Sequence, residues 1–392
     1  MKKPLSSMED KSSLGLVLSG GGARGAYQAG VVMGLYEIAK NVGVNRPFKI
    51  LTGVSSGAIN ISFLAANAND PQAAARDLAN MWSNIRSEDV YRTDLASLST
   101  IGWGWIHDIA TGHAQNRDVP QSLLVTDPLS DLLNSKIKFS GIAENMRNGI
   151  IDSVAVSALN YATSEVNTFF QTRGGVVPWT RIERLSHEVV LAADHVMASS
   201  AIPLFFPPVK LDDGYYGDGS LRNLAPISPA LHLGSGRIIA VGVQSDIRAD
   251  GRRSNLWAKG RGLRSTPSVA RILSVIINGV MMDATAADLE RLKRINHTVS
   301  LLLPTALNES GLRQIPFLYL NPTVDLAKIA EEEDQALPKT IRFLLRGLGP
   351  KDEGADLLSY LLFEPAYSRR LVELGYKDAM VRSGEIGDFM AN

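Results

Sequence analysis

Two glycine-rich turns carry the residues of this chain whose types and spacing could do chemistry. Ser55 lies at the centre of GVSSG (residues 53–57), a G-x-S-x-G pattern in which a sharp strand-to-helix turn lifts a serine hydroxyl clear of a sheet. SGGGARG (residues 19–25) satisfies G-x-G-x-x-G and also follows an apolar run. A serine nucleophile needs a base and a group that stabilises an oxyanion. The two turns together therefore predict acyl transfer.

The first turn admits three other interpretations. A dinucleotide site requires an acidic residue at the end of the second strand, but that strand ends in Leu51-Thr52-Gly53. A P-loop requires a Lys-Ser/Thr pair, which is absent from the turn. A tight turn that merely needs glycine stays open, beside an anion cradle in which successive backbone N–H groups point at one oxygen.

The base that would activate Ser55 is either a histidine or an aspartate. Asp218 lies in GYYGDGS (residues 214–220), where flanking glycines could present its carboxylate beside the serine or simply form a β-turn. His187 and His195 fall in a stretch that we expect to be helical, residues 183–199, where a structural role is the commoner one. The six histidines are His107, His113, His187, His195, His232 and His297.

The order of the elements predicts an α/β fold with a mainly parallel sheet. Strands expected at residues 14–18 and 48–52 each run into a glycine turn and then a helix. The ends of such strands meet at one edge of the sheet, where these folds bind ligands. Further strands are expected at residues 151–159, 166–171, 238–244 and 298–303, and mainly helices beyond Pro322.

Four segments resemble the patatin-like phospholipase (PNPLA) family in order and spacing: GGGARG (20–25), GVSSG (53–57), ASSAIP (198–203) and Asp218-Gly219. The resemblance spans residues 14–222 and implies a three-layer α/β/α fold. It also implies lipid acyl hydrolysis by a Ser55–Asp218 dyad without histidine, metal or organic cofactor. By this resemblance the oxyanion-hole candidates are Gly20, Gly21, Gly22, Ala23, Arg24 and Gly25, and the glycines of the elbow and the acid turn are Gly53, Gly57 and Gly219.

The expected organisation has three parts. Residues 1–13 form a flexible N-terminus, residues 14–304 the patatin-like catalytic domain, and residues 305–392 a mainly helical C-terminal extension. Arg24 is expected to brace the glycine turn, to face an anionic headgroup or to form a surface ion pair. Ser220 stands where the family usually has Gly or Ala after Asp-Gly, a change small enough to keep the turn.

Composition excludes several classes of function. The 392 residues carry 40 Lys plus Arg and 40 Asp plus Glu, so the chain lacks the basic excess typical of nucleic-acid binders. It has no cysteine, which removes thiolate nucleophiles, thiolate metal sites and disulfides. Glu9 and Asp10 stand where a signal peptide would be apolar, and no apolar run has the length of a membrane span. We expect a cytoplasmic protein.

Three rival functions share some of these residues. A lipid transacylase would use the same dyad with an acceptor alcohol in place of water. A catalytically silent lipid-binding module would not need both Ser55 and Asp218, and a nucleotide-binding protein would bind NAD or ATP directly.

One basic segment predicts peripheral membrane contact. Between Arg248 and Arg271 the chain has seven basic residues, one acidic residue and Trp257, a net charge of +6 in a neutral chain. Trp103 and Trp105 form a second candidate, because tryptophan favours the membrane interface. The alternative is a solvated loop together with core tryptophans.

Overall fold

The computed structural model describes residues 13–92, 122–212, 214–245, 284–339, 341–342 and 354–391, with the single positions 266, 268, 272 and 275. Its centre is a ten-stranded sheet in which eight strands follow the order β10-β9-β1-β2-β3-β4-β6-β5, while β8 pairs with β3 and β7 outside this order. Strands β10, β9, β1, β2 and β3 are parallel neighbours, which agrees with the predicted class. The strands are β1 (Leu14–Leu18), β2 (Phe48–Val54), β3 (Ser153–Asn160), β4 (Val166–Thr172), β5 (Thr180–Arg181), β6 (Arg184–Glu188), β7 (Val209–Leu211), β8 (Gly214–Asp218), β9 (Arg237–Val241) and β10 (Phe317–Leu320).

The parallel strands are buried on both faces, so their sequences read as continuous apolar runs. In β1, Leu16 and Leu18 pack into the large core on one face, and Val17 packs into a smaller core on the other. In β9, Ile239 packs into the large core and Ile238 packs into the smaller one. The alternation gives three layers, with helices on either side of the sheet.

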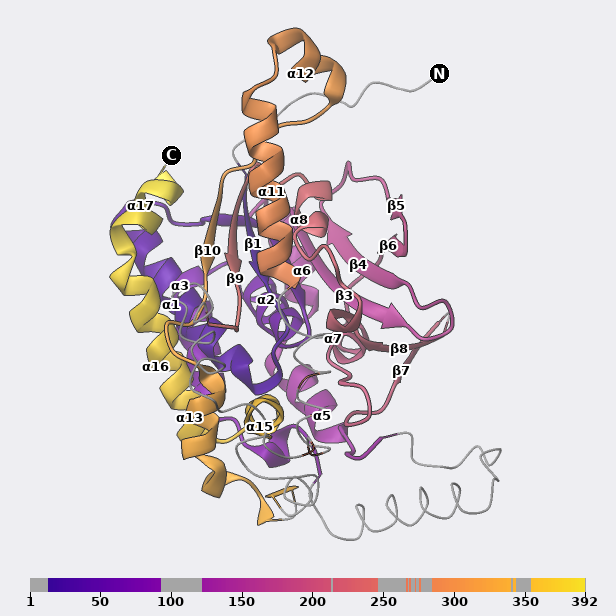
Figure 1. Cartoon of the computed structure of the whole chain (residues 1–392), viewed down its shortest axis with the longest axis vertical. Helices are drawn as coiled ribbons and strands as arrows, with labels where there is room; N and C mark the ends of the chain where they lie inside the picture. Colours follow the sequence, from indigo (N-terminus) through magenta and orange to yellow (C-terminus); the bar gives the residue numbers. More distant parts are fainter. Residues whose placement is uncertain are drawn as a thin grey trace.

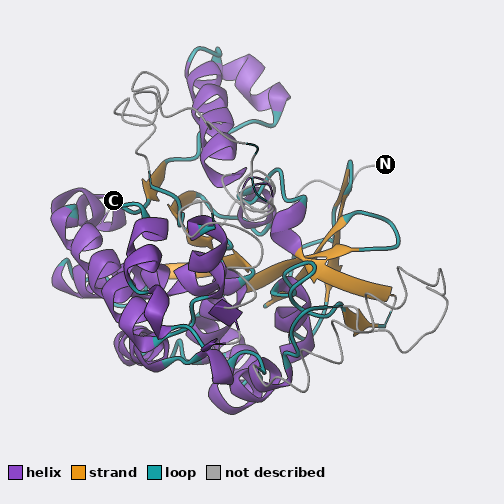
Figure 2. Ribbon diagram, turned by 60° about the horizontal axis from the view of Figure 1, so that its bottom comes forward, coloured by secondary structure: helices purple, strands orange, loops and turns teal. Residues whose placement is uncertain are grey.

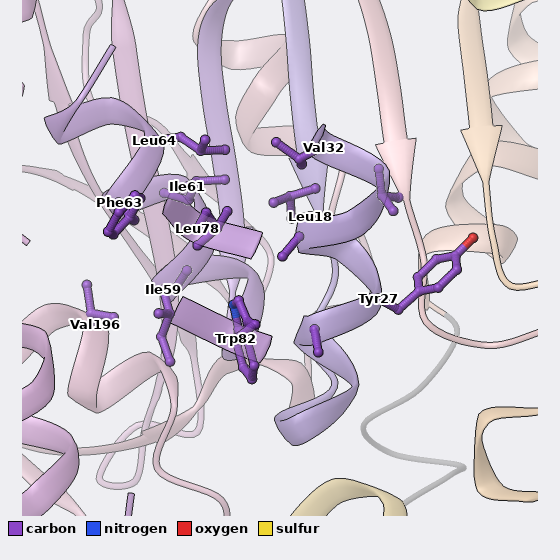
Figure 3. Packing of buried hydrophobic residues seen from close by; sticks show 14 of the residues in the cluster. Leu18, Tyr27, Val32, Ile59, Ile61, Phe63, Leu64, Leu78, Trp82 and Val196 are labelled. Atoms are coloured by element: carbon purple, nitrogen blue, oxygen red, sulfur yellow. The ribbon is translucent and has the colours of Figure 1, made fainter. Parts of the chain in front are cut away.

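Most helices cover the large core, and Figures 1 and 2 show the strands between two groups of helices. Figure 3 shows Leu18, Val32, Ile61, Leu78 and Trp82 among the side chains of this core. The helices of this core are α1 (Gly25–Asn41), α2 (Ser56–Ala66), α3 (Pro71–Asn84), α5 (Asp127–Lys136), α6 (Ser140–Arg147), α7 (Ala193–Ser199), α13 (Leu326–Glu332), α15 (Ala355–Leu361), α16 (Pro365–Val381) and α17 (Ser383–Ala391).

The other face is covered by α8 (Ser228–His232) and α11 (Ala284–Ser300), which bury Ala230, Leu289 and Leu292. Figure 1 shows α11 and α12 at the end of the molecule opposite α15. The remaining elements are α12 (Pro304–Ser310) and the 3-10 turns η1 (Gly22–Arg24), η2 (Ser87–Asp89), η3 (Gly219–Leu221) and η4 (Asp334–Ala336).

Two expected elements were wrong. The helix expected over residues 183–199 is strand β6 followed by α7, because pairing of β6 with β4 overrides the local helical pattern. The strand expected over residues 298–303 is the end of α11 and a turn. A short apolar run does not distinguish strand from helix by periodicity, and Leu301 and Leu303 are exposed.

The region after residue 304 joins the same body as the rest of the chain. Strand β10, which was not expected, pairs in parallel with β9. Helix α16 lies along α1 at very close range, since a Cβ on Gly375 would collide with the Tyr27 carbonyl oxygen and one on Gly30 with the Val372 carbonyl oxygen. Figure 1 shows this helix (yellow) beside α1 (indigo). The C-terminal helices therefore cover the layer that supports the first glycine turn.

Candidate active site

The register of three strands brings Ser55 and Asp218 together. Strand β2 pairs with β3 until Val54 lies opposite Ser157, and Ser55 follows directly. At the next position of β3, Ala158 pairs with Asp218 of β8. Strand β8 thus takes over the place beside β3 where β2 ends, which puts Asp218 beside the turn that carries Ser55.

Ser55 has the strained backbone of a nucleophile elbow. Its φ is 55° and its ψ is −128°, a region that residues with a side chain rarely occupy. The residue is 1% exposed and precedes α2. Its N–H donates to Ser199 Oγ at 3.0 Å, and that hydroxyl donates to the Ser157 carbonyl at 2.7 Å. Ser199 of α7 therefore ties the strained turn to β3.

Asp218 is fully buried, and only one of its two carboxyl oxygens has a hydrogen-bond partner among the described residues. Its N–H donates to the Ala201 carbonyl at 2.9 Å, and its Oδ1 accepts the Ser220 N–H at 2.8 Å. Burial raises the pKa of Asp218 to about 6, and hydrogen bonding from Ser55 and Ser220 offsets part of that rise. Although the Ser55 side chain is near enough to lower this pKa, Oδ2 has no partner of full hydrogen-bond geometry among the described residues. Such a carboxyl can take a proton from a neighbouring hydroxyl.

The segment ASSAIP (198–203) fixes both turns at once, through the Ser199 hydroxyl and the Ala201 carbonyl. The sequence singled out this segment as a block, but its spacing carried no signal of these two hydrogen bonds. The contact with Ser55 is made across 144 positions of the chain.

The first glycine turn passes directly beside Ser55. A Cβ on Gly20 would lie 3.1 Å from the Cβ of Ser55. Gly22 has a φ of +55°, and any Cβ there would collide with the Tyr360 carbonyl oxygen. The N–H of Arg24 donates to the Gly21 carbonyl, and that of Gly25 donates to carbonyls inside the turn. These last two N–H groups are therefore already used within the turn.

A buried chain of polar side chains holds both ends of the first turn. Gln28 Nε2 donates to the Ser19 carbonyl at 2.8 Å, and Asn60 Nδ2 donates to the Gly25 carbonyl at 3.2 Å. Asn60 also donates to Gln28 Oε1 and accepts the Trp82 indole N–H at 2.6 Å. Helices α1, α2 and α3 thereby fix where the turn begins and ends. The sequence analysis missed Gln28 and Asn60, since polar residues inside apolar helices carry no motif.

A narrow apolar pocket opens at Ser55 and Gly22. Its walls come from α2, α3 and α5 and from the segments that follow α7 and α15, and its space admits little more than one water at a time. Its lining is Gly22, Ser55, Ser56, Ile59, Met81, Trp82, Ile85, Val90, Leu129, Leu132, Ser200, Ile202, Phe206 and Phe363. Side chains must shift for a larger apolar group to enter.

The family model for patatin-like phospholipases matches residues 16–231, more than half of the chain. The chain belongs to the patatin-like phospholipase family. Rat calcium-independent phospholipase A2-gamma is 22% identical over 349 residues, which cover 84% of this chain and 40% of that protein. The chain thus spans less than half the length of this curated relative. The family is one of lipid-hydrolysing enzymes, with lipids as substrates.

Solved structures give weaker likenesses. VipD from Legionella pneumophila is 16% identical with a TM-score of 0.36, over 95% of this chain and 67% of that chain. A human GIVD cytosolic phospholipase A2, in complex with methyl gamma-linolenyl fluorophosphonate, is 14% identical with a TM-score of 0.44, over 96% of this chain and 59% of that chain.

In this patatin-like chain, three of the four described histidines have other partners. His187 Nε2 contacts Asn167 Oδ1 at 2.6 Å, and His195 Nδ1 accepts the Ala192 N–H at 3.2 Å. His232 stacks on Trp179, and burial lowers its pKa to about 4. His297 lies on α11. None of these four is hydrogen-bonded to Ser55 or Asp218, and His107 and His113 lie outside the described residues.

The side chain of Arg24 is buried, which excludes the surface ion pair and the headgroup contact among the roles expected for it.

Trp103, Trp105 and Trp257, with the basic residues between Arg248 and Arg271, lie outside the described residues. Within the described part of the chain, no three His, Asp or Glu side chains are grouped to hold a metal ion. No helix described there is both long and apolar enough to cross a bilayer.

Proposed function

We propose that this chain hydrolyses fatty-acyl ester bonds of lipids with Ser55 as nucleophile and Asp218 as general base. The observation that carries the proposal is the strand register that sets the buried Asp218 carboxyl beside Ser55. Family membership supports the substrate class. The strained backbone of Ser55 supports its role, because such strain gathers at active sites.

The reaction has two stages. Asp218 takes the Ser55 hydroxyl proton, the oxygen attacks the ester carbonyl, and the C–O bond breaks as the alcohol leaves with that proton. Asp218 then takes a proton from water, whose oxygen attacks the acyl-serine bond. A fatty acid departs and Ser55 regains its proton. The N–H groups of Gly21 and Gly22 would stabilise the oxyanion in both stages, each worth about 3–4 kcal/mol.

The apolar pocket would receive the acyl chain. Each methylene buried there contributes about 0.8 kcal/mol, or roughly four-fold in kcat/KM. Leu132→Trp on α5 should shorten the pocket by the length of about three methylenes. The kcat/KM for long-chain esters should then fall on the order of 50-fold, whereas the kcat/KM for short-chain esters should stay unchanged. Asp131→Trp, on the exposed face of the same helix, is the matched control. Equal losses for both ester lengths would contradict this use of the pocket.

A lipid panel with mass-spectrometric detection tests the proposed function. The wild-type chain should release free fatty acid from at least one phospholipid or lysophospholipid class, and the Ser55→Ala chain should not. A labelled lipid supplied with a second alcohol separates hydrolysis from transacylation, since a new ester would identify the transacylase. Lipid binding without any acyl product from wild type would instead support a silent lipid-binding module.

Peripheral membrane contact through the basic segment remains a proposal from the sequence. Basic residues near an anionic surface contribute about 1 kcal/mol each. The chain should sediment with anionic vesicles at low salt and be released at high salt. Neutralising Arg252, Arg253, Lys259, Arg261 and Arg264 together should abolish that sedimentation. Vesicle binding that does not depend on lipid charge or on salt concentration would contradict membrane contact through the basic segment.

A further inference from the structure

We infer that the C-terminal helix α15 holds the first glycine turn in its working shape, with Arg24 as the link and Ser359 as a positioning residue. The inference rests on the proposed role of this turn as oxyanion donor. Arg24 lies inside the turn, and α15 lies more than 300 positions later in the chain. No motif in the sequence connects the two.

The contacts of Arg24 are directed at α15. Its Nε and Nη2 donate to Ser359 Oγ at 2.8 and 2.6 Å, and Nη2 lies 3.2 Å from Asp356 Oδ1. Its guanidinium also lies 4.8 Å from the centroid of the Tyr360 ring. The Arg24 side chain is 2% exposed, so its charge needs compensation, to which Asp356 of α15 and Asp325 both contribute.

The direction of the Ser359 hydroxyl follows from its own hydrogen bond. It donates its single proton to the Asp356 carbonyl at 2.5 Å, which leaves its lone pairs to accept from Arg24. One serine therefore receives two N–H groups of the same guanidinium. Because the hydroxyl is fixed by the helix backbone, the position of Arg24 is fixed as well.

The backbone of α15 also lies in close contact with the glycine turn. The Tyr360 carbonyl oxygen lies so close to Gly22 that a Cβ at Gly22 would collide with it. Helix α15 thus meets the turn at Gly22 and again at Arg24, on both sides of Ala23. The N–H groups proposed to hold the oxyanion lie next to these two contacts.

The chain that leaves α15 is anchored beside the pocket. Tyr91 OH donates to the Leu361 carbonyl at 2.7 Å, and Ser87 Oγ donates to the Phe363 carbonyl at 3.3 Å. The Phe363 side chain lines the apolar pocket. Residues 354–363 therefore serve as a wall of the site and as a clamp on its glycine turn.

Ser359→Ala and Asp356→Asn in the full chain test the clamp. Ser359→Ala removes the acceptor of two N–H groups. Asp356→Asn keeps an acceptor but loses the charge, at a side chain that is 18% exposed. Ser368→Ala is the matched control, because Ser368 is a fully buried serine of α16 whose hydroxyl has no hydrogen-bond partner among the described residues.

The readouts are kcat and KM for a soluble ester, the unfolding temperature, and hydrogen exchange of the peptide that contains residues 19–25. For Ser359→Ala we expect kcat to fall by about 10- to 100-fold with KM within about two-fold, since small misplacements of a catalytic group cost this much. Exchange in the turn should become faster. Asp356→Asn should follow with a smaller loss of kcat, and Ser368→Ala should match wild type in kcat and exchange.

Unchanged kcat and unchanged exchange in folded Ser359→Ala would overturn the clamp, and so would equal changes in Ser368→Ala. If Ser359→Ala does not fold, Asp356→Asn decides by the same two readouts. A wild-type chain without ester hydrolysis would contradict the proposed function instead. The exchange measurement would still test the clamp in that case.

Discussion

Ser55→Ala is expected to lower ester hydrolysis by about 10⁴- to 10⁶-fold while the protein stays folded. The hydroxyl would be the group that forms the acyl bond, so its loss removes the nucleophile that the Asp218 carboxylate would activate. The measurement is kcat with the best substrate of the lipid panel, taken together with the unfolding temperature. Retained hydrolysis by a folded Ser55→Ala chain would remove Ser55 from the mechanism.

Ser55→Gly is a useful companion variant because it separates catalysis from backbone strain. The φ of 55° at Ser55 is unfavourable for a residue with a Cβ but allowed for glycine. Ser55→Gly should therefore be as inactive as Ser55→Ala, yet more stable by about 1–2 kcal/mol. Equal stability of the two variants would mean that the turn stores no strain at this position.

Asp218→Asn is expected to lower kcat by about 10⁴-fold. The substitution preserves shape, and its Oδ1 can still accept the Ser220 N–H, but an amide cannot take the Ser55 proton. Because both residues act in one unit, the Ser55→Ala/Asp218→Asn double variant should be little worse than either single one. Kinetics of the three variants with one substrate measure this directly.

His232→Ala and His297→Ala are the matching controls for the base. Both should keep kcat within about three-fold of wild type, since these histidines have no hydrogen bond to Ser55 or Asp218. If either lost as much activity as Asp218→Asn, a Ser–His–Asp triad would replace the dyad.

The raised pKa of Asp218 gives the pH dependence a definite sign. Only the ionised carboxylate is a base, so kcat/KM should rise with pH through about 6 and then level off. The folded chain holds this proton up to about pH 6, whereas an unfolded aspartate releases it near 3.8. Wild-type stability should therefore fall as pH rises between these values, by about 3 kcal/mol in all. Asp218→Asn should lack that fall and be the more stable chain at pH 8.

The sequence was sufficient for the fold class and for the two turns. Alternating strands and helices with glycine at each junction predicted the parallel sheet that β1, β2 and β3 form. The elbow motif is local, so Ser55 could be proposed as nucleophile without knowledge of the fold. Asp218 was harder to assign, because the pattern left open a β-turn role beside a role next to the serine, and the resemblance favoured the latter. The register of β8 against β3 is a non-local property that single-sequence patterns do not encode.

The supporting residues were out of reach of the sequence for the same reason. Ser199, Asn60 and Ser359 act through hydrogen bonds to residues that are 144, 35 and 335 positions away. Strand β10 was missed because it is a short edge strand of four residues. The sequence showed that Arg24 belongs to the first glycine turn. Its partners on α15 became apparent only in the structure, where the C-terminal region lies beside that turn.

The most direct test of the Ser55–Asp218 dyad is the mapping of a fluorophosphonate adduct by peptide mass spectrometry. A wild-type chain should carry one adduct, on the peptide that contains Ser55, at a rate that rises with pH through about 6. Asp218→Asn should label far more slowly, and Ser55→Ala should not label at all. An adduct on another serine, or an active enzyme that carries none, would contradict the dyad.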